Sequence, residues 1–124
     1  MILRLGLLLL LCLPLAACGR SSEDTVRDFF EQIGDNEIEK AAAMFSPELK
    51  ARFSQAELVR ATGQLADHMR IHRGLKKITL RGGVITYQEL ALYDAILSFG
   101  DGTNRKLQIT VLYRGGEWRV NTAL

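Results

Sequence analysis

The spacing of apolar residues changes twice along the chain. An apolar segment runs from Ile2 to Ala17, with Arg4 as its one charged residue. Between Val26 and His72 apolar side chains recur every three or four positions, which is the spacing of one face of a helix. After Leu75 apolar and polar residues alternate, which is typical of strands that bury one face. The pattern predicts an apolar leader, then helices, then an antiparallel sheet.

Three helices are expected before the sheet. The first begins at Ser21 or Ser22, either of which can cap its N-terminus, and ends at Gly34. A second, shorter helical region runs into Ser46-Pro47 and continues for a further turn, because proline is well placed at a first helical position. A third and longer helix is expected to begin at the capping box of Ser54 and Glu57.

The first hairpin is expected to turn at Gly82-Gly83, a pair that suits a two-residue loop. Strand two would then run from Val84 to Phe99, and a strand of that length must bend, so the sheet should curl around the helices. The cross-strand pairs expected from this turn are Leu80 with Ile85, Ile78 with Tyr87, and Lys76 with Glu89.

The two later turns differ in type. A two-residue loop at Asp101-Gly102 would put Leu97 opposite Lys106, so a loop with an odd number of residues is preferred, because a one-residue slip reverses every side chain. That loop predicts the pairs Leu97 with Leu107, Ala95 with Ile109, Tyr93 with Val111 and Ala91 with Tyr113. A two-residue hairpin at Gly115-Gly116 predicts Tyr113 opposite Trp118 and Val111 opposite Val120.

The leader resembles the signal peptide of bacterial lipoproteins. Arg4 provides the positive end, an apolar run follows, and Leu15-Ala16-Ala17-Cys18 resembles a lipobox, in which the cysteine is acylated after cleavage. A transmembrane helix is the competing interpretation, but the run from Leu5 to Ala17 falls short of the roughly 20 residues needed to cross a bilayer. A plain secretory signal is the other, and Cys18 at the first position after the cleavage site argues against it.

This interpretation divides the chain into a removed leader (residues 1–17), the lipidated Cys18 with a short tether (residues 18–22), and one domain (residues 23–124). The other cysteine, Cys12, leaves with the leader, so the mature domain can form no disulfide. The expected location is the cell envelope. Gly19 rather than Asp after the cysteine resembles sorting to the outer membrane, facing the periplasm, in a cell with two membranes.

The domain resembles the nuclear-transport-factor-2-like (NTF2-like, cystatin-like) superfamily, and most of all its small bacterial lipoproteins of unknown function. The resemblance rests on the order of the expected helices and strands and on local sequence similarity in five segments: Val26 to Phe30, Gly34-Asp35, Ala41 to Phe45, Ser46 to Leu49, and Gly116 to Val120. It implies an α+β fold with three N-terminal helices packed on a curled four-stranded antiparallel meander. In that superfamily the cone between helix and sheet is an enzyme pocket, a ligand pocket or plain core, and the open sheet face often forms dimers.

The candidate pocket lies inside this cone. Glu89 is the one carboxylate that the expected register turns inward, and it could act as a general base if burial raised its pKa. The alternative is an ion pair with Lys76. The candidate lining consists of Tyr87, Glu89, Tyr93, Tyr113, Trp118 and His72, although aromatic residues at strand spacing are more often plain core. His68 and His72 have the spacing of two metal ligands but no third, so neither a metal nor another cofactor is expected.

Two surfaces could contact a partner. The segment between Asp67 and Glu89 contains no acidic residue and five cations: Arg70, Arg73, Lys76, Lys77 and Arg81. These side chains could bind anionic headgroups, a cell-wall polymer or an acidic partner, or they could simply complete a helix end and protect an edge strand from aggregation. The outer sheet face is expected to expose Leu90, Leu92, Ile96 and Leu112, with Leu92 opposite Leu112, and could bind a second copy or an envelope protein.

The charge balance excludes one class of partner. The net charge of +2 is too small to favour nucleic acid, and no aromatic residues are interleaved with the cations. The leading hypothesis is therefore a membrane-anchored, non-enzymatic binding or interaction module of the envelope. The alternatives are a small isomerase or hydrolase that uses the cone, and a purely structural envelope protein.

Overall fold

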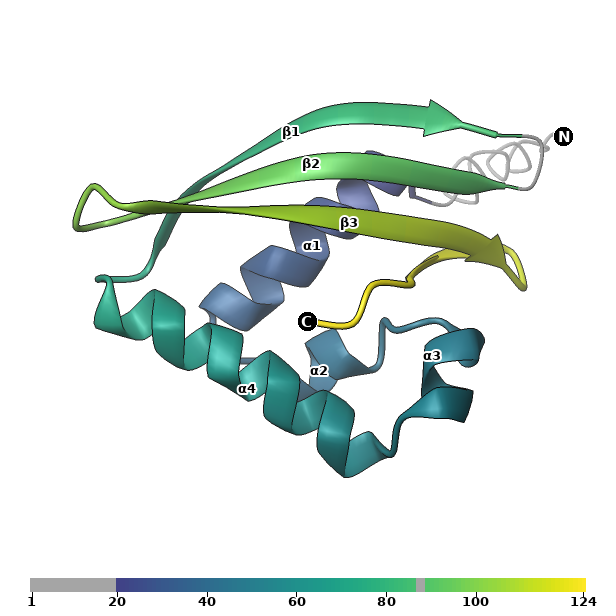
Figure 1. Ribbon diagram of the computed structural model, residues 1–124, viewed down its shortest axis with the longest axis horizontal. Coiled ribbons are helices and arrows are strands. Elements are labelled where there is room, and N and C mark those ends of the chain that lie inside the picture. Colours follow the sequence, from purple (N-terminus) through teal and green to yellow (C-terminus); the bar gives the residue numbers. More distant parts are fainter. Residues whose placement is uncertain (1–19, 87–88) are drawn as a thin grey trace, which may run out of the picture.

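The computed structural model describes residues 20–86 and 89–124 as four helices beneath one curved sheet (Figure 1). The helices are α1 (Ser22–Gly34), α2 (Ile38–Ala42), α3 (Pro47–Arg52) and α4 (Gln55–Ile71). The strands β1 (Leu75–Ile85), β2 (Leu90–Phe99), β3 (Asn104–Arg114) and β4 (Glu117–Val120) pair in chain order as an antiparallel meander. The predicted α+β architecture is confirmed, with α3 as a fourth, short helix.

Serine residues cap three of the helices, as the sequence predicted for the first and the last. The Ser21 hydroxyl accepts a hydrogen bond from the Asp24 backbone N–H, at 3.1 Å. At α4 the capping box is complete, because the Ser54 hydroxyl accepts from the Glu57 N–H and the Glu57 carboxylate accepts from the Ser54 N–H. No helix of the described residues is long and apolar enough to cross a membrane. The leader and Cys18 lie outside the described residues.

The core fills the space between α1 and the concave face of the sheet. The stripe of α1 that the sequence predicted is buried, and the Phe29 ring packs edge-on against Phe45 with 5.4 Å between ring centroids. The sheet side is closed by Leu97, Ile109 and Val111, none of which is exposed to solvent. The side chains form one continuous cluster, so the space between α1 and the sheet is a packed core. A groove of about 220 Å³ remains between α4 and β3, lined in part by Leu65, Leu107 and Ile109.

The predicted turn at Gly82-Gly83 is wrong. β1 continues through both glycines to Ile85, and β2 begins at Leu90, whose carbonyl accepts a hydrogen bond from the Thr86 backbone N–H at 3.0 Å. Ile78 lies opposite Leu97, and Val84 lies opposite Leu92. Gly82 and Gly83 instead form a bulge in which both residues have positive φ, a conformation that glycine adopts without strain. The expected pairs of Lys76 with Glu89 and Ile78 with Tyr87 are therefore absent from the register of the described residues.

The other two turns follow the predictions more closely. Between β2 and β3 the loop is odd and the predicted faces are kept, but the register differs by two residues, with Ala95 opposite Leu107 and Tyr93 opposite Ile109. Between β3 and β4, Val111 lies opposite Val120 and Tyr113 opposite Trp118, as predicted.

Candidate functional site

The structure separates the residues of the candidate pocket. Glu89 is exposed, has a φ of 57°, and lies in the turn between β1 and β2, where its backbone N–H donates to the Thr86 carbonyl at 2.9 Å. The prediction that Glu89 faces the cone is wrong, because the hairpin turns later than expected. Tyr87 lies outside the described residues.

The aromatic members of the set also lie apart. Tyr93 is buried in the core, and its hydroxyl lies 2.5 Å from the Ser22 hydroxyl. Tyr113 and Trp118 form an edge-to-face pair across strands β3 and β4, with 5.2 Å between ring centroids. They are a packing pair rather than the wall of an internal cavity.

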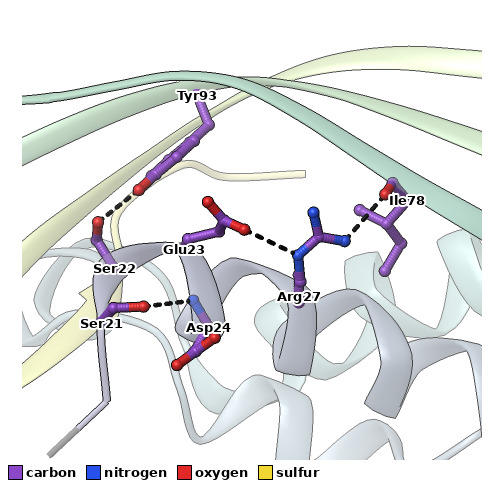
Figure 2. Close-up of polar contacts among 7 residues, drawn as sticks. All are labelled: Ser21, Ser22, Glu23, Asp24, Arg27, Ile78 and Tyr93. Atoms are coloured by element: carbon purple, nitrogen blue, oxygen red, sulfur yellow. Dashed lines mark hydrogen bonds and ion pairs between the residues drawn. The ribbon is translucent and has the colours of Figure 1, made fainter.

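Figure 2 shows how polar contacts hold the start of α1 against the sheet. The Ser22 hydroxyl points toward Tyr93 of β2. One turn later, the Arg27 guanidinium donates to the Ile78 carbonyl of β1 at 3.0 Å and to the Glu23 carboxylate at 3.3 Å. β1 is an edge strand, and Arg27 joins it to α1. These contacts fix the position of the first turns of α1 against the sheet.

His72 belongs to a different cluster, at the C-terminal end of α4. Its Nδ1 lies 2.7 Å from the Asp101 carboxylate, in the turn between β2 and β3. Asp101 also accepts hydrogen bonds from the Thr103 hydroxyl at 2.6 Å and the Thr103 N–H at 3.0 Å. The contacts from Thr103, and then from His72, lower the pKa of the Asp101 carboxyl. The contact between Asp101 and Thr103 was not predicted from the sequence. The signal for it is the segment Asp-Gly-Thr, because an aspartate side chain often accepts a hydrogen bond from the backbone N–H two residues later.

His68 packs beside this cluster. Its ring lies 4.5 Å from that of His72, centroid to centroid, and 5.3 Å from that of Phe99. Burial lowers the pKa of His68, as do the nearby positive charges of His72 and Arg105. Within residues 20–86 and 89–124, no group of three or more His, Cys, Asp or Glu side chains could hold a metal ion. The histidines join α4 to the hairpin through Phe99 and Asp101.

The five predicted cations are spread from the end of α4 along β1. Arg70 is paired with Asp67 at 2.9 Å. Elsewhere in the described part of the chain, Arg73, Lys76 and Lys77 form no ion pair, and all three are exposed. Arg73 has a φ of 70°, which is uncommon for a residue other than glycine. A groove of about 320 Å³, the distal groove, is lined by Ile33, Gly34, Asn36, Ala66, Arg70, Arg73 and Gly74.

The distal groove lies at the C-terminal end of α1, since Ile33 and Gly34 line it. Ser22 begins the helix beside Tyr93, whereas Gly34 ends it beside Leu75, at the other end of the sheet. A helix of this length spans about 20 Å. Arg70 and Arg73, which also line the groove, are therefore roughly one helix length from the start of α1.

The outer sheet face exposes fewer apolar residues than predicted. Leu92 is 45 % exposed, but Leu112 is 6 % exposed, and Leu90 and Ile96 are intermediate. Leu92 lies opposite Thr110, whereas Leu112 lies opposite Leu90. The prediction of four exposed residues with Leu92 paired to Leu112 is wrong, because the register between β2 and β3 differs by two residues.

Comparisons with known proteins identify the fold. No model of a known protein family matches the sequence, and no curated protein matches it. Among solved structures, the chain resembles a Campylobacter jejuni protein named "Putative NTF2-like transpeptidase", with a TM-score of 0.72. The match covers 83 % of this chain and 99 % of that chain, at 13 % sequence identity, so the likeness concerns the fold alone. The domain therefore has the NTF2-like fold that the sequence resemblance implied.

Proposed function

We propose that the chain is a membrane-anchored lipoprotein of the bacterial cell envelope, and that its NTF2-like domain is a non-enzymatic binding module. The observation that carries the second part is the packed core between α1 and the sheet, which leaves a groove of about 220 Å³ between α4 and β3. Phe29, Phe45 and Ile109 are completely buried within one continuous cluster, in the space where related folds hold a ligand. Binding would then use the surface of the domain.

The proposal of an anchor rests on the lipobox-like segment that ends at Cys18 and on the start of the fold. α1 begins at Ser22, so only residues 19–21 separate it from the lipidated cysteine. Residues 18–22 can reach no more than roughly 14 Å. The domain would be held against the membrane, on the periplasmic side of the outer membrane in a cell with two membranes.

The surface best suited to a partner is the distal groove together with the adjoining start of β1. Arg73, Lys76 and Lys77 are exposed there without ion-pair partners in the described part of the chain. Unpaired cations next to a groove suit an anionic partner, since carboxylates would regain the charge pairing that these side chains lack. The proposed partner is an acidic protein segment of the envelope.

The enzyme alternative has weaker support. Its general base was to be Glu89 inside the cone, and Glu89 is exposed in a turn. His72 and Asp101 form a histidine–carboxylate pair, but the Thr103 hydroxyl beside them donates to the carboxylate and thereby helps to brace the turn. No second catalytic group is positioned by these contacts.

The binding surface is tested with the full-length protein purified from membranes and an immobilised oligoglutamate peptide. The wild type should be retained, and retention should fall as salt rises. Arg73→Glu with Lys77→Glu should abolish retention, whereas Lys50→Glu with Arg60→Glu, which makes the same charge change on α3 and α4, should leave it intact. Equal retention of both double variants would contradict the assignment of this surface.

A further inference from the structure

Exposed apolar side chains gather at one end of the domain. Val84 is 77 % exposed and Ile85 57 %, at the end of β1. Leu92 lies directly opposite Val84, and Tyr113, at the end of β3, is 36 % exposed. Large exposed apolar clusters are uncommon on proteins that have no contact to make there. We call the set of Val84, Ile85, Leu92, Tyr113 and Trp118 the turn end.

The turn end is also where the tether enters. Tyr113 donates its backbone N–H to the Glu89 carbonyl at 2.9 Å, so the two hairpin turns lie side by side. Arg20, which precedes α1, and Trp118, which follows the turn between β3 and β4, line the same surface groove. Figure 1 shows the start of α1, the end of β1 and the turn between β3 and β4 at the same end of the sheet, opposite the end of α4.

The end of β1, next to the first hairpin turn, is apolar on both faces. Val84 and Leu92 lie on the outer face, whereas Ile85 pairs with Ala91 on the face that carries the core. The described residues of the turn itself, Thr86 and Glu89, are polar and exposed. A second copy or another protein docked on the sheet would cover one face of the strand. The interfacial region of a bilayer surrounds an inserted strand end on all sides and offers polar headgroups to the turn, so it covers both faces.

Three cations near the turn end are paired within the domain, whereas Arg81 of β1 is exposed and forms no ion pair within the described residues. Arg20 contacts Asp28, Arg114 contacts Glu48 at 2.8 Å, and Arg119 contacts Glu117. Electrostatic attraction to anionic lipid is therefore not the main contribution at this end. Tyr and Trp side chains favour the boundary between headgroups and acyl chains, which is where Tyr113 and Trp118 would lie.

We infer that the turn end inserts into the interfacial region of the bilayer to which Cys18 is anchored. This inference rests on the proposed lipid anchor, because a tethered domain meets the bilayer at high effective concentration and a small apolar contact then suffices. Insertion orients the domain with the distal groove facing away from the membrane, where a partner can reach Arg73.

The test uses Trp118, the one tryptophan of the chain, as a depth reporter. Full-length protein purified from membranes is reconstituted in phosphatidylcholine vesicles whose acyl chains carry bromine near the headgroup. Wild-type Trp118 fluorescence should be quenched, without any need for anionic lipid. Val84→Asn with Ile85→Asn should lose that quenching. Because both side chains are largely exposed, the variant should keep its fold, which circular dichroism checks.

The matched control is Ile71→Asn. Ile71 is 71 % exposed but lies at the end of α4, on the far side of the domain. This variant should be quenched like the wild type. Absence of quenching in the wild type, or quenching that survives Val84→Asn with Ile85→Asn, would overturn the inference. Cross-links between copies that Val84→Asn abolishes, in protein that is not quenched, would show a dimer interface instead.

Flotation of the vesicles separates the two proposals. Protein that floats but shows no quenching retains its anchor and refutes only the insertion of the turn end. Protein that fails to float refutes the anchor itself, whatever its fluorescence.

Discussion

The hydroxyl oxygens of Ser22 and Tyr93 lie 2.5 Å apart, and both side chains are buried. Ser22 is the first residue of α1 and Tyr93 lies in the middle of the sheet, so this hydrogen bond joins the start of α1 to β2. A buried polar pair of this kind is strongly favoured over either group alone, because each hydroxyl has lost its water. The contact therefore holds the first turn of α1 against the sheet.

Removing both members of this pair should destabilise the fold by less than the sum of the two single removals. Tyr93→Phe leaves the Ser22 hydroxyl buried without its partner, which should cost about 1 to 3 kcal/mol of unfolding free energy. Ser22→Ala added to Tyr93→Phe should cost less than the sum of the single changes, with a coupling of about 0.5 to 3 kcal/mol. Urea denaturation of the four proteins measures it. Additive effects would show that the two hydroxyls do not interact.

Gly83 is required because the Tyr93 ring lies against it. A Cβ added at Gly83 would approach the ring within 2.7 Å, and the φ of 91° is strained for other residues. Gly83→Ala should therefore lower the unfolding free energy by more than about 1 kcal/mol. Gly63→Ala is the control, since nothing lies within 4 Å of its added Cβ inside α4, and it should stabilise the protein by about 0.4 to 1 kcal/mol. Equal effects at both positions would contradict the close contact with Tyr93.

The same glycines explain why the first hairpin could not be predicted from sequence. Gly-Gly satisfies a two-residue turn, and it also satisfies a bulge that admits an aromatic ring. The choice depends on Tyr93, whose position is set by Ser22, so the deciding contact is distant in sequence. The capping box at Ser54 and the hairpin at Gly115-Gly116 are local, and both were predicted correctly.

The second hairpin shows an intermediate case. Alternation of apolar residues determined which side chains face the core, because a slip of one residue would bury polar groups. A slip of two residues keeps the faces, so alternation cannot detect it. The loop is fixed instead by hydrogen bonds of Asp101, which contacts Thr103 within the loop and His72 just after α4.

The candidate surfaces could be predicted only in part. The exposed cations of the distal end follow from charge alone, and exposure of Arg73, Lys76 and Lys77 agrees with that expectation. The turn end could not be found in this way, because the mistaken turn at Gly82-Gly83 assigned Ile85 to the buried face. Its exposure arises only when β1 extends beyond the bulge.

Acid should weaken the contact between α4 and the second hairpin. Hydrogen bonds from Thr103 and His72 hold the pKa of Asp101 below its ordinary value of 3.8. A lowered folded-state pKa stabilises the fold at pH values above 3.8, and that stabilisation is lost as the pH falls below 3.8. Urea denaturation from neutral pH to about pH 2 should show this loss. Asp101→Asn should reduce the slope in the acid range, and an unchanged slope would contradict the role of Asp101.

A second titration occupies a higher pH range. The pKa of His68 lies below its ordinary value of 6.5, chiefly because of burial, so the folded protein resists protonation of this ring. Stability should therefore decline as the pH falls through 6.5. His68→Gln should flatten that upper part of the profile and leave the effect of Asp101 in place. A profile unchanged above pH 3.8 would contradict the burial of His68.

The packed cone predicts a large cost for removing an aromatic ring from it. Phe45 is fully buried, packs on Phe29, and forms a backbone bridge to Val120 of β4. Phe45→Ala should lower the unfolding free energy by about 3 to 5 kcal/mol, since the surrounding core closes only in part. Ile71→Ala, at an exposed position, should change it by less than about 0.5 kcal/mol. A small cost at Phe45 would indicate an open cavity in the cone.

The proposed attachment to the membrane depends on the lipid on Cys18. To test it, wild type and Cys18→Ser are expressed with radiolabelled palmitate, and the membranes are then separated by flotation. The wild type should carry label and float quantitatively, whereas Cys18→Ser should be unlabelled and stay with the soluble fraction, because the apolar contact of the turn end is too small to retain it without the lipid. Quantitative flotation of unlabelled Cys18→Ser would contradict the anchor.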